Sequence, residues 1–112
     1  MHEYSVIQAL VDSVEAHTAG HDGAVKLLRV SIGELAGVDA TLLASAYDVF
    51  RAGTICENAL LEIVPVSARW SCSRCGLEIP RGQALRCVSC GGEAKLSRGD
   101  EILLDQIELE VQ

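Results

Sequence analysis

Five cysteines stand in the chain, and four of them form two identical C-x2-C pairs: Cys72 and Cys75, then Cys87 and Cys90. Eleven residues lie between the pairs, and a glycine, Gly76 or Gly91, follows each pair. Each pair can present two thiolates about one tetrahedral edge apart, and because glycine takes a positive φ at low cost, backbone N–H groups can turn toward the sulfurs. Two facing turns can supply four thiolates, which predicts a closed tetrahedral Zn²⁺ site of the structural kind.

The same four cysteines admit two other interpretations. Iron in a rubredoxin-like site uses the same ligands, but such sites are normally wrapped in aromatic residues, and Trp70 is the one aromatic residue in this segment. A disulfide pair is disfavoured where thiols stay reduced. We therefore expect zinc. Cys56 is unpaired in this scheme and precedes an apolar stretch, so we expect a small buried residue and not a reactive thiol.

A second set of metal donors opens the sequence, Met1-His2-Glu3. The terminal amine of Met1, the backbone nitrogen of His2 and its imidazole can chelate one ion through adjacent rings. The amide or carboxylate of Glu3 could add a further donor. Nitrogen-rich sets of this kind suit Ni²⁺ or Cu²⁺. A solvated chain terminus is the competing interpretation, which the spacing alone favours.

Charge divides the chain into segments. The formal charge is −7, with 49% apolar residues. Residues 68–100 hold six bases and three acids, whereas the flanking segments are acidic. We therefore expect a zinc-binding module at 68–100 and an α+β domain built from 1–67 and 101–112. No apolar run approaches the roughly 18 residues of a membrane span, and the start lacks the features of a signal peptide, so we expect a cytoplasmic protein.

Apolar residues recur with helical spacing in two segments. The first helix is predicted between Ser5, which with Gln8 fits a capping box, and Gly20, which fits a stop. The second begins at Asp39, a good N-cap, and ends before Gly53. The predicted core face of the first helix holds Val6, Ile7, Leu10, Val11 and Val14, and that of the second holds Leu42, Leu43, Ala46, Tyr47 and Phe50.

Alternating or continuous apolar residues predict strands at 25–32, 61–66 and 107–111. Together with the helices they predict an α+β fold in which two helices pack on one face of a small mixed sheet. The four-cysteine module, resembling a zinc ribbon, would then be inserted before the last strand. His17 and His21 are expected on the surface near the end of the first helix.

Several segments taken together resemble the HypA/HybF family of hydrogenase nickel-incorporation proteins: the opening MHEYSV, then IGELAGVD, FRAGT, ALLEI and the paired C-x2-C turns. The resemblance runs through essentially the whole chain in order. It implies that the Met1 amine, His2 and Glu3 bind nickel, with Asp39 as a further candidate ligand. It also implies that Cys72, Cys75, Cys87 and Cys90 bind a structural zinc.

The resemblance further implies delivery of nickel to the large subunit of [NiFe]-hydrogenase, in concert with a partner GTPase, HypB. Asp39 has a simpler role as a helix N-cap, and both roles are compatible if one oxygen caps while the other faces the metal. We find neither a phosphate-binding loop nor a nucleophilic arrangement, so we do not expect an enzyme.

Two other functions compete with nickel delivery. Zinc ribbons of this spacing occur in nucleic-acid-binding modules and in adaptors that bind only protein. Four thiolates on one zinc ion would cut the positive charge of residues 68–100 by two, and the rest of the chain is acidic, which phosphate backbones repel. Aromatic residues for base stacking are also scarce, at 4%. We therefore expect no nucleic acid and no membrane as partner.

Overall fold

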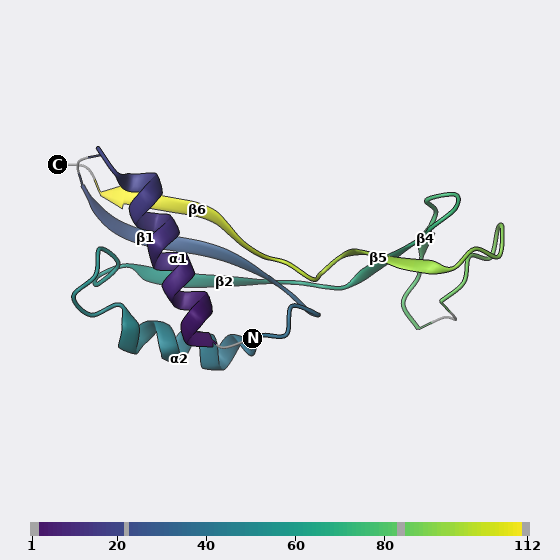
Figure 1. The fold of residues 1–112 in the computed structure, drawn as a ribbon, viewed down its shortest axis with the longest axis horizontal. Helices are drawn as coiled ribbons and strands as arrows, with labels where there is room; N and C mark the ends of the chain where they lie inside the picture. Colours follow the sequence, from purple (N-terminus) through teal and green to yellow (C-terminus); the bar gives the residue numbers. More distant parts are fainter. Residues whose placement is uncertain (1–2, 22, 83–84, 111–112) are drawn as a thin grey trace.

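The computed structural model describes residues 3–21, 23–82 and 85–110. The molecule is elongated, measuring 56 × 26 × 17 Å along its principal axes. Two small sheets lie at its two ends, joined by a narrow pair of connecting segments (Figure 1). None of the helices in these described ranges is long and apolar enough to cross a membrane.

The first sheet has three strands in the order β2-β1-β6. β1 pairs with β2 in parallel and with β6 in antiparallel fashion. The parallel pairing requires a crossover between the two strands, and α2 supplies it. Both helices cover the same face of the sheet (Figure 1), so the predicted two-helix layer on a mixed sheet is confirmed. The bounds are α1 Glu3–Thr18, β1 Ala24–Gly33, α2 Ala40–Phe50, β2 Leu60–Val66 and β6 Ile102–Glu110.

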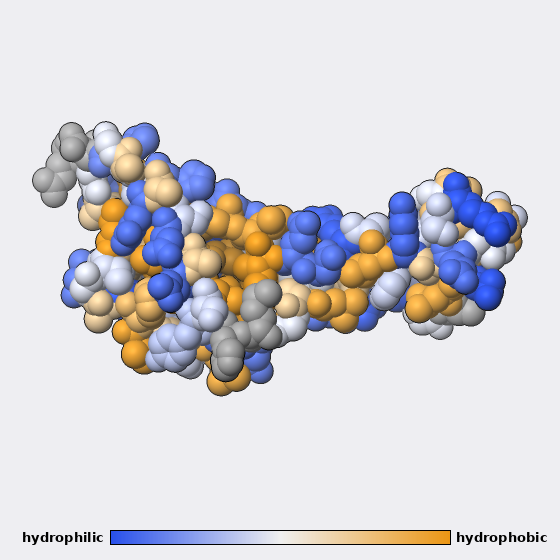
Figure 2. Space-filling view, viewed as in Figure 1, coloured by the Kyte–Doolittle hydropathy of each residue, from blue (hydrophilic) through white to orange (hydrophobic). Residues whose placement is uncertain are grey.

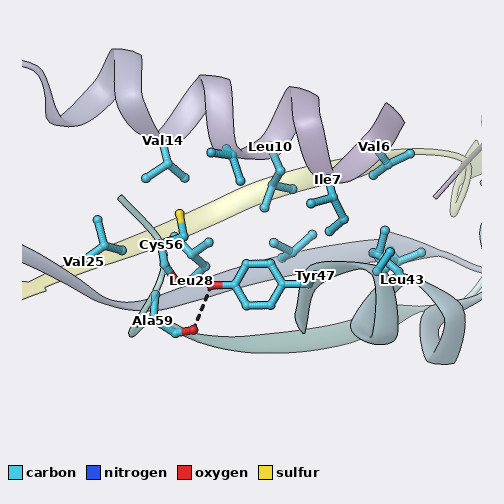
Figure 3. Close-up of a cluster of buried hydrophobic side chains, with 14 residues drawn as sticks. Val6, Ile7, Leu10, Val14, Val25, Leu28, Leu43, Tyr47, Cys56 and Ala59 are labelled. Atoms are coloured by element: carbon cyan, nitrogen blue, oxygen red, sulfur yellow. Dashed lines mark hydrogen bonds between the residues drawn. The ribbon is translucent and has the colours of Figure 1, made fainter. Parts of the chain in front are cut away.

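The main hydrophobic core lies between the helices and this sheet (Figure 3). All five residues of the predicted α1 face are buried, as are Leu28, Val30 and Ile32 of β1. On α2, Leu43 and Tyr47 are buried, whereas Leu42 is exposed. The Tyr47 hydroxyl donates to the Ala59 carbonyl at 2.8 Å, so the polar end of this buried ring is satisfied.

The second sheet carries the cysteine turns and has the strand order β4-β3-β5. Its strands are β3 Arg69–Cys72, β4 Glu78–Ile79 and β5 Ala94–Arg98. Its apolar cluster is small, consisting of Cys72, Ile79 and Cys87 with Trp70 and Ala94 packed against them. So small a core supplies little hydrophobic stabilisation of its own. The surface at the far tip of this sheet mixes hydrophilic and hydrophobic patches (Figure 2).

Two details of the predicted elements are wrong. α1 begins at Glu3, so Ser5 lies inside the helix and cannot be its cap. The last strand begins at Ile102, five residues before the predicted start. Gln106 pairs with Arg29 and Leu104 pairs with Val30, which leaves Asp105 as an extra residue in a bulge. Because this bulge interrupts the alternation of apolar residues, the alternation did not predict the early part of the strand.

Candidate metal centre

The two C-x2-C turns share one backbone design. In the first, the Gly76 amide donates to the Cys72 carbonyl at 3.0 Å, and the Cys72 amide donates to the Leu77 carbonyl at 2.8 Å. The second repeats both bonds fifteen residues later, from Gly91 to Cys87 and from Cys87 to Gly92, at 2.9 Å each. Gly76 and Gly91 have φ of +76° and +74°, which confirms the role predicted for the glycine after each pair.

The four cysteine sulfurs meet at one point of the second sheet. The Sγ atoms of Cys72 and Cys90 are 3.4 Å apart, and those of Cys75 and Cys87 are 3.6 Å apart. All four lie within 4.8 Å of one another. A tetrahedral zinc with Zn–S bonds of about 2.3 Å needs sulfurs about 3.8 Å apart. The donor set and its spacing therefore fit a four-thiolate zinc ion.

Backbone amides favour the thiolate form of the first cysteine in each pair. The amides of Cys75 and Arg74 donate to the Cys72 sulfur at 3.5 and 3.4 Å, which lowers the pKa of Cys72 to about 6. The amides of Cys90 and Ser89 lower the pKa of Cys87 in the same way. A metal must displace the thiol protons, and these amides reduce that cost at two of the four ligands.

The second cysteine of each pair holds its proton more firmly. The Leu77 amide lowers the pKa of Cys75, but hydrogen bonds to the Cys87 and Cys72 sulfurs outweigh it and raise the pKa. At Cys90 the Gly92 amide has the same lowering effect, and the Cys72 sulfur does most to raise the pKa, to about 11. Four sulfurs in contact cannot all ionise unless a cation offsets their charge, so the four-thiolate form of this cluster would require a bound metal ion.

Gly92 is part of this centre, although sequence reasoning did not single it out. A Cβ built on Gly92 would lie 2.6 Å from the Cys72 sulfur, so a side chain here would displace a ligand atom. Gly92 is also the residue whose carbonyl accepts the Cys87 amide. The doublet Gly91-Gly92 was the available signal: one glycine supplies the positive φ, and the second supplies the space.

Of the candidate nickel donors, Met1 and His2 lie outside the described residues. Glu3 is the first described residue of α1 and, with Tyr4, lines a shallow pocket against Leu42, Ser45 and other residues of α2. Asp39 stands at the start of α2. The first described turn of α1 therefore lies beside α2, as Figure 1 shows.

Asp39 is the N-cap of α2, as predicted. Its Oδ1 atom accepts from the amides of Thr41 and Leu42 at 2.9 and 3.1 Å. Its backbone φ of −83° and ψ of 118° are those of a residue just outside a helix. Both capping bonds use the same oxygen, which leaves Oδ2 free of the cap.

The remaining candidates take the simpler roles expected for them. Cys56 is fully buried in the main core, and burial raises the pKa of its thiol, so it is an unreactive core residue. His17 and His21 are exposed. The His17 Nδ1 atom lies 2.7 Å from the Ser13 carbonyl, within its own helix.

A family model described as "Hydrogenase/urease nickel incorporation, metallochaperone, hypA" matches residues 1–109. The chain belongs to the HypA family. The hydrogenase maturation factor HypA of Nitrosospira multiformis is 38% identical over 113 residues, covering 97% of both chains. That of Helicobacter hepaticus is 32% identical over 117 residues, covering 100% of this chain and 99% of its own. Members of this family are metallochaperones, which confirms nickel incorporation over the nucleic-acid and adaptor alternatives.

Two solved structures share the fold over the full length of this chain. The solution structure of the nickel metallochaperone HypA from Helicobacter pylori superposes with a TM-score of 0.77 at 27% identity, and both chains are covered completely. A second solution structure of a HypA protein gives a TM-score of 0.83 at 27% identity, covering 98% of that chain. The arrangement of a helical layer and a cysteine-bearing sheet is thus the HypA fold.

Proposed function

We propose that this protein binds Ni²⁺ through the Met1 amine, His2 and Glu3, with Asp39 as a further ligand, and delivers it to the large subunit of [NiFe]-hydrogenase. The match of the nickel-incorporation family over residues 1–109 carries this proposal, because it includes the MHE start. Two observations support a site here. Glu3 lies against α2, and Asp39, the N-cap of α2, has an Oδ2 atom that the cap does not use.

The chemistry of these donors suits transfer rather than storage. A site made from a chain terminus and one imidazole encloses its ion on few sides, so ligands of an acceptor protein can replace its own one at a time. The net charge of −7 favours encounter with a cation without fixing it in place. The family resemblance implies that the hydrogenase large subunit accepts the nickel and that a partner GTPase, HypB, assists the transfer. Both steps would take place in the cytoplasm.

For the second metal we infer that Cys72, Cys75, Cys87 and Cys90 hold a structural Zn²⁺. Four thiolates leave no coordination position for water or substrate, so the ion would supply folding energy and no catalysis. The residues around it form the module at 68–100, and residues 1–67 with 101–112 form the nickel-binding domain. The separate apolar clusters of the two sheets support this division.

The nickel site is tested by changing where the chain begins. In the untagged, zinc-loaded protein, His2→Ala should abolish stoichiometric Ni²⁺ binding in titration calorimetry, because it removes the imidazole that closes the chelate. An N-terminal extension should weaken binding nearly as much, although every side chain remains. Binding should also fall as the pH drops below the pKa of the amine and imidazole, since both must be unprotonated to coordinate.

His17→Ala is the matched control, because it removes an exposed imidazole from α1. It should leave Ni²⁺ affinity unchanged. Equal Ni²⁺ binding by the untagged and extended proteins would rule out the terminal amine, and His17, His21 or the cysteine cluster would then be the next sites to examine.

A further inference from the structure

The turn between β1 and α2, at residues 34–37, reaches both segments that connect the two sheets. The Glu34 amide donates to the carbonyl of Val66, the last residue of β2, at 2.8 Å. The Leu35 amide donates to the carbonyl of Gly99, just after β5, at 2.7 Å. The outgoing and the returning segments are therefore both tied by main-chain bonds to the same turn.

These three stretches of backbone meet without room for side chains. A Cβ on Gly33 would lie 2.2 Å from the carbonyl group of Gly99. A Cβ on Gly99 would in turn lie 2.6 Å from the Cα of Ala68, and Gly99 has a φ of +103°. Glycine is thus required at both positions, by close approach at Gly33 and by approach and conformation together at Gly99.

One side chain of the turn continues these contacts into the second sheet. The Glu34 carboxylate accepts from the Ala68 amide at 2.9 Å and from the Arg81 guanidinium, whose Nη2 lies 3.0 Å from Oε2 and whose Nη1 contacts Oε1. Arg81 follows β4, so it belongs to the cysteine-bearing part of the chain. The Arg81 pairing and the Ala68 amide together hold the pKa of Glu34 at about 2, so the carboxylate remains charged.

We propose that Glu34 is a latch that fixes the orientation of the cysteine-bearing sheet against the helical layer. The main-chain bonds of the turn hold the two connecting segments, and the Glu34–Arg81 pair reaches beyond them to the segment after β4. A two-point pairing of carboxylate and guanidinium is directional, so it restrains rotation as well as distance. The partners are 42% and 60% exposed, and exposed pairs are weak, so this latch can open reversibly.

The latch also lies on the path to α2. Glu34 and the N-cap Asp39 are five residues apart in the same connection, which contains no strand or helix of its own. A movement of the second sheet that pulls on Glu34 therefore acts on the start of α2. This inference concerns orientation only, so it stands whether or not Asp39 binds nickel.

The full-length, zinc-loaded protein allows a direct test by residual dipolar couplings of backbone amides in an aligned medium. In the unaltered protein one alignment tensor should fit both sheets. In Arg81→Gln and in Glu34→Gln we expect the two sheets to require separate alignment tensors. The magnitude of the tensor for β3 and β5 should fall to half or less of the magnitude for β1, β2 and β6. Unchanged zinc content and unchanged amide shifts in the helical layer serve as the folding check.

Arg69→Gln is the matched control, since it breaks a single pair with Glu78, 3.0 Å long and similarly exposed, that lies within the second sheet. It should retain one tensor. The exchanged double variant, Glu34→Arg with Arg81→Glu, should recover part of the common alignment that Glu34→Arg alone loses. A single unchanged tensor in Arg81→Gln would overturn the proposal, as would equal loosening by Arg69→Gln. If Glu34→Gln fails the folding check, Arg81→Gln decides alone.

Discussion

At the scale of single residues, the surroundings of the cysteine sulfurs distinguish ligands that look equivalent in the sequence. Cys72 is fully buried and receives two backbone amides, whereas Cys75 and Cys90 are exposed. The spacing of the four cysteines was enough to predict that they meet. The need for Gly92 beside them was not predictable, because it depends on how closely β5 approaches Cys72 in the folded sheet.

We expect Gly92→Ala to weaken zinc binding, because the new methyl group overlaps the Cys72 sulfur and forces it off its position. Cys75→Ala should go further and release the metal, with loss of dispersed amide signals from β3 to β5 while α1 and α2 persist. Zinc analysis and competition with a chromophoric chelator measure both effects. Zinc retained at full stoichiometry in Cys75→Ala would contradict the assignment.

Cys56→Ala provides the comparison within the same residue type. It removes one buried heavy atom from the main core, at a cost of about 1 kcal/mol. Zinc content should stay unchanged, because Cys56 belongs to the hydrophobic cluster of the helical layer.

At the scale of elements, Asp39 and Tyr47 fix the two ends of α2. Asp39 caps its first turn through Oδ1, and near its end the Tyr47 hydroxyl bonds to the carbonyls of Ala59 and, at 3.3 Å, Cys56. The cap was predictable from the residue type and its place before an apolar periodic segment. The Tyr47 bonds were not, because they join α2 to a segment whose path follows from tertiary packing.

A pair of substitutions at Asp39 separates its capping role from nickel ligation. Asp39→Ala should lower the free energy of unfolding by about 1 kcal/mol, because two amides of the first turn lose their acceptor. Asp39→Asn keeps an oxygen acceptor and should leave stability nearly unchanged. Chemical denaturation measures both. If Asp39 is also a nickel ligand, Asp39→Asn should weaken Ni²⁺ binding without loss of stability; equal affinity would limit Asp39 to the cap.

The strands show where sequence periodicity fails. β1 was predictable because Leu28, Val30 and Ile32 alternate with other residues in a stretch bounded by turn residues, and it occupies the middle of its sheet. The first half of β6 was not, since the bulge at Asp105 shifts the alternation of inward and outward residues. The prediction that Ser5 caps α1 was wrong for another reason. A sequence that fits a capping box also fits the interior of a helix that starts earlier.

At the scale of the whole molecule, the two sheets differ in what stabilises them. Among the residues that the structure describes, the core of the helical layer has fourteen buried residues, whereas that of the second sheet has three, two of which are candidate zinc ligands. The proposed zinc ion would therefore take the place of a hydrophobic core in the smaller part. This asymmetry predicts that removal of zinc will affect the two parts to very different degrees.

Treatment of the purified protein with an excess of a strong chelator should unfold the second sheet while the helical layer stays folded. Circular dichroism should retain its helical signal, and amide signals of Arg69–Cys72 and Ala94–Arg98 should collapse to the positions of unfolded chain. Readdition of Zn²⁺ should restore them. Loss of the helical signal in step with zinc would show that the two parts fold as one unit.

Gly33, Gly99 and Ala68 meet at a narrow waist, which would serve as the pivot of a lever if the second sheet turned relative to the helical layer. The pivot lies at one side of the helical layer, and the cysteine turns stand at the far end of a body 56 Å long. A rotation of a few degrees at the pivot sweeps the tip through a much longer arc. A force applied to the tip would therefore act through a long arm on the turn that leads into α2.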